Sequence, residues 1–554
     1  MKLFNMKKAQ TKTIGIVATL VIFISSFNYS YVNAAEASPL LEARNIIQNY
    51  YLNDVSDEVL NSSSIEDMVK QLNDPYSTYF TKEEYESFIS SIDNNFTGIG
   101  IQVLTDEEGV KITSVFNTSP AEESGLKVGD IIVKANDIAL KGLSSEQAIS
   151  YIKGEEGTSV HLVIKRDSST FEVNVIRKQI SLPTVEGEVL NNHIGYIEIN
   201  SFGEGTPDEF KQNLEKLEEA NVESYIVDLR YNPGGYVEAA MDIGGYFIGD
   251  KSLMIIKNGT GASTSFKAYK HDMIIDKPVI FLINQYSASA SELLSAAIKD
   301  YKKAIFIGKT TYGKGVAQGI FPLSDGSFIK LTTYEFLSPY KNTINHVGVS
   351  PDFQVDDKDI DSLYLSDLLL SEADNSKNIE SLDNKQGYIK VLINNESFYI
   401  NMNEARKDEN WEAYKYLIDN TDTDNLFLGK GSGWTSFASE GLDRNLEDKT
   451  NLLYPNDKVL KSLTKNSKDK TFTIKFNKAV DPKTANNETI ELINGDTGQR
   501  ISANIEVTQG SKATISLKDE LQQGSYYLVV SDKVKDEEGK KLRKETVTKV
   551  KVIN

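Results

Sequence analysis

The segment at residues 279–301 reads VIFLINQYSASASELLSAAIKDY. Its first part, Val279 to Asn284, is a near-continuous apolar run, which is typical of a strand buried on both faces of a sheet. Its last part, Ser291 to Tyr301, has the apolar spacing of a helix. We therefore predict a strand, a turn that holds Ser289, and a helix whose first amides face that turn.

Two further strands and a helix precede this unit. Ile194 to Ile199 and Ser224 to Leu229 read as buried strands, and Asp208 to Ala220 reads as an amphipathic helix. Strands that alternate with helices indicate a layered α/β domain. We expect this core to span residues 180–372.

Ser289 is a candidate nucleophile, because a strand–helix junction can expose a hydroxyl beside amides that would stabilise an oxyanion. A serine-rich stretch is also a favoured helix cap, so this segment alone leaves both interpretations open. The chain has only four histidines, His161, His193, His271 and His346. They give a Ser-His-Asp triad no support, although the members of a triad are distant in sequence and the pattern does not exclude one.

Lys314 is the alternative base. It lies in Tyr312-Gly313-Lys314-Gly315, after an apolar run, and a buried lysine can lose its charge near neutral pH and accept a proton. Gly-Lys-Gly is also a common turn with a solvated lysine. Two amide donors for an oxyanion could come from Ala290 and from the Gly234-Gly235 turn, which by itself signals only a tight loop.

The segments before the core form two units. Residues 38–95 read as a helical cap: apolar residues recur at helical spacing from Leu40 to Leu72, Asn73 to Tyr76 stops the pattern, and Thr81 with Glu84 has capping-box spacing. Residues 96–179 change to short strands with glycine turns, which indicates a small β-rich domain.

The segments after the core are less regular. Beyond about Asp352 the composition shifts to Asp, Ser and Asn, which predicts a linker. Residues 385–447 form a small module with a hairpin at Gly387 to Asn403, and residues 458–554 alternate at period two, as in a β-sandwich. Asn420 to Asp424 hints at a calcium loop but lacks its glycine and glutamate, so we expect a solvated turn and no metal site. The predicted fold class is a multidomain α+β chain.

The first 34 residues read as a secretory signal peptide, with basic residues followed by an apolar run and an A-x-A-like site at Val32 to Ala34. Retention as an anchor is the alternative. The chain has no cysteine, and cysteine-free exported chains are common in Gram-positive bacteria, so we expect a secreted or cell-envelope protein. The net charge of −20 argues against nucleic acid as a partner.

Several motifs in this order resemble the C-terminal processing peptidases, also called tail-specific proteases. The resemblance covers about Leu40 to Leu370 and is carried by Leu72-Asn73-Asp74-Pro75-Tyr76-Ser77, Asp228-Leu229-Arg230, Asn232-Pro233-Gly234-Gly235, Ser287 to Glu292, Tyr312 to Gly315 and Gly348-Val349-Ser350-Pro351-Asp352. It implies a serine endopeptidase in which Ser289 is the nucleophile, Lys314 the base and Gln318 the residue that orients the lysine. The implied oxyanion donors are Ala290 and one of Gly234 and Gly235, with Gly234 preferred.

Residues 96–179 resemble a PDZ domain, with Phe96 to Ile101 similar to its carboxylate loop. The implied peptide-binding residues are Gly98, Ile99, Gly100 and Ile101, together with Ala148, Ile149 and Ile152 on a helix. Lys153 stands where many relatives have an arginine that couples peptide binding to activity, which leaves that coupling in doubt. Residues 458–554 resemble the Ig-like domains of bacterial surface proteins, so the extension could attach the enzyme to the envelope.

The resemblance implies protein substrates with apolar, unstructured C-termini, peptide hydrolysis without a cofactor, and a capacity to form homodimers. A PDZ scaffold or surface adhesin without catalytic activity is the main rival. A Ser-His hydrolase of small esters is a further alternative, which the PDZ domain disfavours.

Overall fold

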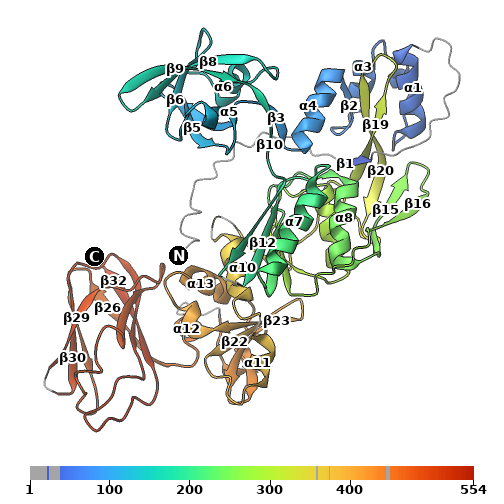
Figure 1. Ribbon diagram of the computed structural model, residues 1–554. Helices are drawn as coiled ribbons and strands as arrows, with labels where there is room; N and C mark the ends of the chain where they lie inside the picture. The colour runs from blue at the N-terminus through green and yellow to red at the C-terminus, as the bar shows by residue number, and fades with distance from the viewer. Residues whose placement is uncertain are drawn as a thin grey trace.

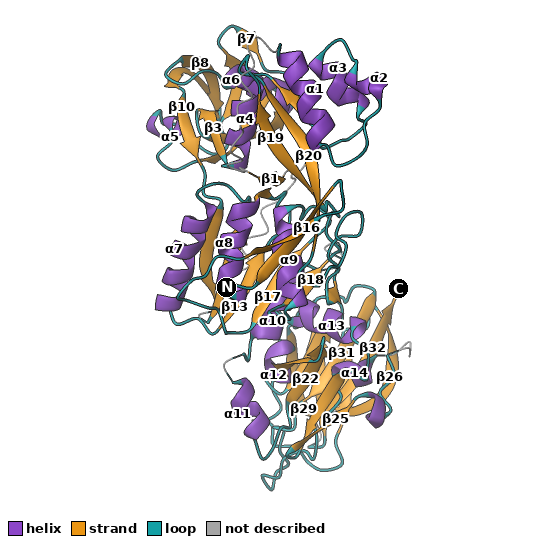
Figure 2. Ribbon diagram, turned by 90° about the vertical axis from the view of Figure 1, so that its right-hand side faces the viewer, coloured by secondary structure: helices purple, strands orange, loops and turns teal. Residues whose placement is uncertain are grey.

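The computed structural model describes residues 21–23, 38–191, 193–356, 358, 360–373, 375–444, 449–508 and 510–554. The chain forms an elongated molecule (Figures 1 and 2). The helical cap and the β-rich domain of residues 96–179 lie at one end, the α/β core lies in the middle, and the C-terminal modules lie at the other end. The predicted multidomain fold class is confirmed.

The core is built on a six-stranded sheet in the order β11-β12-β13-β17-β18-β21. Only β11 is antiparallel to its neighbour. The strands are β11 (Val185–Leu190), β12 (Ile194–Ile199), β13 (Ser224–Asp228), β17 (Val279–Ile283), β18 (Ile305–Gly308) and β21 (Phe353–Gln354). One face packs against α7 (Thr206–Glu219), α8 (Val237–Ile248) and α9 (Ala290–Asp300). The strands and helices predicted around Ser289 are confirmed to within two residues.

A second sheet connects the core to the cap. Its strand order is β14-β1-β19-β20-β15-β16, and β2 pairs with β20. Its members are β1 (Val21–Phe23), β2 (Thr78–Phe80), β14 (Gly235–Tyr236), β15 (Ser252–Asn258), β16 (Ser263–Lys267), β19 (Val316–Pro322) and β20 (Phe328–Leu337). Strand β1 pairs in parallel with both β14 and β19. An extended chain thus fits between these two strands.

The cap is more broken than its apolar spacing predicted. In place of one long helix the structure has α1 (Pro39–Tyr50), α2 (Asp57–Leu60) and α3 (Ile65–Gln71), because Ser38, Ser56 and Ser64 each start a new helix as N-caps. Helix α4 (Lys82–Ile92) begins with the predicted capping box of Thr81 and Glu84. The cap packs its apolar side chains on β19 and β20.

The domain of residues 96–179 is joined to the cap by a two-stranded ladder of β3 (Asn95–Gly98) and β10 (Lys178–Ser181). Its sheet has the order β4-β5-β6-β8-β9, with β7 beside β6. The strands are β4 (Ile101–Asp106), β5 (Gly109–Val115), β6 (Ile131–Ala135), β7 (Ile138–Ala139), β8 (Ser159–Arg166) and β9 (Ser169–Ile176). Two helices, α5 (Pro120–Glu123) and α6 (Ser145–Ile152), complete the domain.

The prediction of a linker after Asp352 is wrong in part. Helix α10 (Ser362–Leu370) follows the core strands, and all of its residues except the partly buried Tyr364 are buried. The polar composition suggested an exposed linker, but Ser362, Ser366 and Asp367 are buried in the structure. The helix covers the second face of the core sheet.

The small module has a four-stranded sheet in the order β23-β22-β24-β25, and its predicted hairpin is present. Its elements are α11 (Ser376–Ser381), β22 (Tyr388–Ile393), β23 (Glu396–Asn401), α12 (Met402–Ala405), α13 (Trp411–Asn420), β24 (Leu426–Lys430), β25 (Gly433–Ser436), the 3₁₀ turn η2 (Ala438–Glu440) and α14 (Thr450–Leu453). At the suspected calcium loop Asp422 forms an ion pair with Arg444. The described ranges hold no group of three or more His, Cys, Asp or Glu side chains arranged to bind a metal ion.

The C-terminal domain is a sandwich of two sheets, β26-β32-β31-β28 and β27-β30-β29. The strands are β26 (Lys458–Asn466), β27 (Thr471–Lys475), β28 (Ile490–Asn494), β29 (Ala503–Thr508), β30 (Lys512–Leu517), β31 (Gly524–Val530) and β32 (Thr546–Ile553).

One hydrophobic cluster joins the core sheet, α10, the small module and this sandwich. Trp411 is fully buried at the junction and donates its ring N–H to the Gly495 carbonyl at 3.1 Å. The sandwich packs closely against it, because a Cβ added at Gly498 would lie 2.4 Å from the Cβ of Trp411. The three units are therefore packed together as one body.

The predicted signal peptide lies outside the described residues except for Val21–Phe23. Among the helices that the structure describes, none combines the length and apolar character needed to cross a membrane.

Candidate active site

Ser289 is the N-cap residue of α9 and has φ 63° and ψ −116°. This backbone conformation is strained for a residue with a Cβ, and such strain is held where the surroundings impose it, often at functional sites. The flanking serines supply that support. Ser287 donates to the Leu229 carbonyl at 2.7 Å, and Ser291 donates to the Asn232 carbonyl at 3.1 Å. These contacts give the outer serines a structural role and leave the cap position to Ser289.

Lys314 is fully buried, so the interpretation of a solvated Gly-Lys-Gly turn is wrong. Its Nζ donates to Oε1 of Gln318 at 2.8 Å and lies 4.7 Å from the centre of the Tyr76 ring. Burial, together with the positive charge of Lys330, holds the pKa of Lys314 well below its usual value. A lowered pKa favours the neutral amine, which is the form that accepts a proton.

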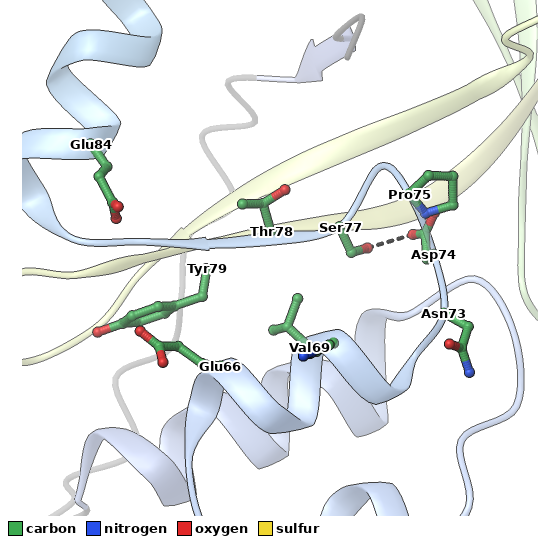
Figure 3. Close-up of a pocket in the computed structure, with 10 residues that line it drawn as sticks. Glu66, Val69, Asn73, Asp74, Pro75, Ser77, Thr78, Tyr79 and Glu84 are labelled. Atoms are coloured by element: carbon green, nitrogen blue, oxygen red, sulfur yellow. Dashed lines mark hydrogen bonds between the residues drawn. The ribbon is translucent and has the colours of Figure 1, made fainter. Parts of the chain in front are cut away.

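A hydrogen-bonded chain leads from Lys314 into the cap. Gln318 donates to the Thr332 hydroxyl at 3.2 Å, and the Thr332 N–H donates to the Ser77 hydroxyl at 3.0 Å. Ser77 in turn donates to Asp74 at 2.5 Å, as the close-up in Figure 3 shows. The loop that carries these two residues borders a cavity of about 630 Å³. The cap thus fixes the orientation of the glutamine beside the lysine.

Glu292 connects the two segments that hold the serine and the lysine. One carboxylate oxygen accepts the backbone N–H groups of Ser289 at 2.9 Å and Lys314 at 2.8 Å. The other accepts the Gly313 N–H at 2.6 Å and the Thr311 hydroxyl at 2.5 Å. Burial raises the pKa of Glu292, and these four donors oppose that shift. A single buried carboxylate therefore sets the spacing of both segments.

The Gly-Gly turn lies against the serine. A Cβ added at Gly234 would lie 2.7 Å from the Cβ of Ser289, so only glycine fits there. However, the Gly234 N–H already donates to the Asn232 side chain at 2.8 Å. To act as an oxyanion donor the Gly234 N–H would have to give up this bond, and the choice between Gly234 and Gly235 stays a prediction. Ala290 is the first residue of α9, and its N–H has no acceptor within the helix.

Arg230 fixes this turn to the rest of the core. Its guanidinium donates to Asp228 at 2.7 Å, to Asp361 at 2.5 Å and to the Ser362 hydroxyl at 3.2 Å. Asp361 is the N-cap of α10. The helix that the sequence suggested to be linker thus supports the turn beside Ser289.

Three of the four histidines make side-chain contacts outside this site, and His346 is exposed. His161 pairs with Glu172 on neighbouring PDZ-region strands, and His271 lies 3.1 Å from Asp242 and stacks on the Tyr246 ring. His193 contacts the Asn191 carbonyl at 2.8 Å, and His346 donates its backbone N–H to the Gly313 carbonyl. These contacts give no support to a Ser-His triad.

Comparison with known proteins agrees with this geometry. Family models match residues 193–355 as peptidase family S41, residues 97–176 as a PDZ domain, residues 459–550 as a bacterial Ig-like domain and residues 25–84 as the N-terminal domain of the activating protease CtpB. A probable CtpA-like serine protease of Staphylococcus haemolyticus is 32% identical over 392 residues, which is 70% of this chain and 79% of that protein. The chain belongs to peptidase family S41. It is a serine-type protease.

A second relative of this S41 peptidase gives the same result. A probable CtpA-like serine protease of Staphylococcus aureus is 33% identical over 396 residues, again covering 70% of this chain and 79% of the relative. Among solved structures, the photosystem II D1 C-terminal processing protease is 24% identical, with a TM-score of 0.39, over 58% of this chain and 94% of that one.

In the PDZ domain of this S41 peptidase, the predicted peptide-binding residues divide into two groups. Ile99, Ala148 and Ile152 are buried in the domain core, whereas Ile101 and Ile149 stay partly exposed. Gly98 is the last residue of β3. Gly100 has φ 82°, and a Cβ added there would lie 2.3 Å from the Cβ of Ser119. Of these side chains, Ile101 and Ile149 have the exposure that a bound peptide would require.

Lys153, the C-cap residue of α6, has its Nζ 5.6 Å from the centre of the Phe96 ring. Phe96 belongs to β3, the ladder strand that joins the PDZ domain to the cap. The PDZ helix therefore contacts the connection between the two domains.

The sequence interpretation missed the roles of Glu292, Thr332, Ser77 and Lys330 in this S41 peptidase. Only Glu292 carried a local signal, because it stands three residues after the cap serine at capping-box spacing. The other three come from the cap loop and β20 and reach the lysine only in the folded chain.

Proposed function

We propose that this S41 peptidase is an exported endopeptidase that holds the C-termini of protein substrates in its PDZ domain and cuts them with a Ser289–Lys314 dyad. The observation that carries this proposal is the fully buried amine of Lys314, which donates to Gln318 in a segment tied to Ser289 through Glu292. A neutral amine held there can act as the general base. Gln318 orients it.

The reaction then follows the usual course of acyl transfer. Lys314 takes the proton of the Ser289 hydroxyl as that oxygen bonds to the scissile carbonyl carbon, and the carbonyl electrons move to the oxygen. The Ala290 and Gly235 N–H groups stabilise this oxyanion. The C–N bond breaks, the leaving amine takes the proton from Lys314, and water repeats the sequence to release the acyl group. No step needs a cofactor.

The slot between β14 and β19 suits an extended substrate. Strand β14 directly follows the Gly234 turn, β19 carries Gln318, and β1 lies between them in parallel pairing with both. Backbone pairing on two edges would hold a substrate strand with little regard to its side chains. Removal of residues 1–34 as a signal peptide would take β1 out of this slot and leave it to the substrate.

The PDZ domain supplies selectivity in this proposal. The backbone amides of Gly98 to Ile101 would hold a terminal carboxylate, and Ile101 and Ile149 would contact an apolar tail. Lys153, which contacts the strand between the domains, is the residue we propose to relay peptide binding. Homodimers and attachment of the C-terminal modules to the envelope are further parts of the proposal.

Two experiments test the proposal: covalent labelling of Ser289, and cleavage of two reporter substrates that differ only at the C-terminus. A fluorophosphonate probe should label Ser289 in the wild type, as identified by peptide mass, and should not label Ser289→Ala. An unfolded reporter that ends in three apolar residues with a free carboxylate should be cut with kcat/KM at least about tenfold higher than the same reporter with an amidated end. Ile149→Asp should abolish that difference. Absence of labelling would favour the PDZ scaffold, and equal cleavage of both tails would remove the PDZ domain from substrate selection.

The pH dependence of the enzyme is expected to respond to Lys330. Its ammonium lies 5.1 Å from the centre of the Phe88 ring, burial lowers its pKa to about 8, and its charge lowers the pKa of Lys314. Lys330→Met removes that charge, so the pKa of Lys314 rises and less neutral amine is present at a given pH. The acid limb of kcat/KM against pH should therefore move to higher pH. Lys303→Met, at an exposed site, should leave the limb in place; an unmoved or lowered limb in Lys330→Met would contradict the assignment.

A further inference from the structure

The Ig-like domain contains a cavity of about 680 Å³ that is strongly basic. It lies between the segment that follows β27 and the segment that precedes β32. Its cationic lining residues are Lys458, Lys478, Lys535, Lys540, Lys541, Arg543 and Lys544. The one acidic residue in the lining is Asp536. This concentration of positive charge contrasts with the net charge of −20 for the whole chain.

The acidic residue does not neutralise the cavity. Asp536 accepts the backbone N–H groups of Glu538 and Lys540 at 3.1 and 2.9 Å and pairs with Lys478 at 3.3 Å. Lys478 is shared with Glu538 at 3.0 Å. Among the residues that the structure describes, no ion pair involves the other six cations of the lining, which are Lys458, Lys535, Lys540, Lys541, Arg543 and Lys544. Most of the positive charge of the lining is therefore not paired directly with a carboxylate.

The loop that carries these cations is held in one shape. The Asp536 N–H donates to the Lys540 carbonyl at 2.9 Å, and the Leu542 N–H donates to the Val534 carbonyl at 2.9 Å. On the other side of the cavity, the Val480 N–H donates to the Gly510 carbonyl at 2.7 Å. Because this backbone is already paired, an incoming chain would find side-chain charge and little free backbone. A ligand would lose little binding free energy to ordering the loop.

We propose that this cavity binds a phosphodiester polymer of the cell envelope, a chain of polyol units joined by phosphates. Clustered like charges destabilise a fold, so they are most readily explained by an anionic partner that pairs with them. Lysine ammonium groups are compact charges that suit phosphates spaced along a flexible chain, whereas an acidic peptide would gain most from backbone pairing, which this loop does not offer.

The acidic remainder of the chain sharpens this selectivity. Because the whole chain carries a net charge of −20, an anionic polymer would gain most at the basic cavity, so binding there would orient the enzyme on the polymer. The choice of an envelope polymer rests on the proposed export. Binding itself is independent of the Ser289–Lys314 dyad, so failure of one does not imply failure of the other.

The experiment measures binding of synthetic poly(glycerol phosphate) to the full chain by calorimetry at 50 and 200 mM NaCl. The triple variant Lys540→Gln, Lys541→Gln, Lys544→Gln should bind at least about tenfold more weakly than the wild type, and wild-type affinity should fall about tenfold or more between the two salt concentrations. The matched control Lys461→Gln, Lys468→Gln, Lys518→Gln removes three exposed lysines from the same domain and should change affinity less than about twofold. Thermal unfolding of each variant checks the fold.

The comparison arms use polyglutamate and single-stranded DNA of equal charge. If polyglutamate binds more tightly than poly(glycerol phosphate), the partner is an acidic peptide and not the proposed polymer. If DNA binds more tightly than poly(glycerol phosphate), the proposal of an envelope polymer is wrong. Unchanged affinity in the triple variant, an equal loss in the control variant, or no binding by the wild type would overturn the site.

Discussion

Lys314→Met is expected to lower kcat/KM for protein cleavage by about 10³-fold to 10⁴-fold while the enzyme stays folded. Methionine fills the same buried apolar space as the lysine stem but cannot take a proton from Ser289. The loss should appear in kcat, because the amine acts on the reacting hydroxyl and not on substrate binding. The measurement is steady-state cleavage of an unfolded reporter, with circular dichroism as the check on folding.

The double variant makes this test specific to a dyad. Ser289→Ala should abolish cleavage to a similar extent, and adding Lys314→Met to it should cause almost no further loss, since two residues that act as one unit are not additive. Lys303→Met, an exposed lysine, serves as the control and should retain full activity. More than a tenth of wild-type activity in Lys314→Met would exclude the lysine as the base.

Glu292→Gln is expected to lower kcat by about 10²-fold and to reduce thermal stability. The glutamine keeps the shape of the side chain but turns one acceptor oxygen into an NH₂ group. In either orientation two buried donors lose their acceptor: those of Ser289 and Lys314, or those of Gly313 and Thr311. Each unsatisfied donor costs about 1–3 kcal/mol, so the two segments should shift to relieve it.

A pH profile separates a positioning role from a merely structural one. The charge of Glu292 raises the pKa of Lys314, so its removal should lower that pKa and move the acid limb of kcat/KM to lower pH, opposite to the shift expected for Lys330→Met. Glu209→Gln is the matched control, because one oxygen of Glu209 accepts the N–H groups of Thr184 and Val185 at 2.6 and 3.0 Å outside this site. It should lower stability without moving the limb. If the acid limb of kcat/KM does not move in Glu292→Gln, then Glu292 has a structural role only.

The sequence predicted the strand–turn–helix around Ser289 well because each part carries a local signal: an apolar run, small turn residues and helical spacing. It failed at α10, since a helix that is buried on all sides tolerates Ser362, Ser366 and Asp367 once neighbouring groups satisfy them, and composition alone then resembles a linker. It also merged three cap helices into one, because apolar spacing continues across Ser56 and Ser64 while the backbone does not.

In the candidate site, too, some residues could be predicted from local motifs and others could not. Ser289 and Lys314 stand in short motifs that can be read locally. The contacts that tune them cannot, because Ser77, Gln318 and Thr332 come from separate strands and loops and meet only through the sheet that links the cap to the core. The sequence also did not show that the Gly234 N–H donates to the side chain of Asn232, a contact that bears on the choice between Gly234 and Gly235 as oxyanion donor.

The shared hydrophobic cluster around Trp411 has a mechanical consequence. An enzyme on a flexible tether can reach substrates anywhere within the length of that tether. Here the core that carries Ser289 packs against the small module and the Ig-like domain, so Ser289 stays at a fixed distance from the C-terminal end. Attachment at that end would therefore set both the distance of Ser289 from the attachment surface and the direction from which a substrate must approach.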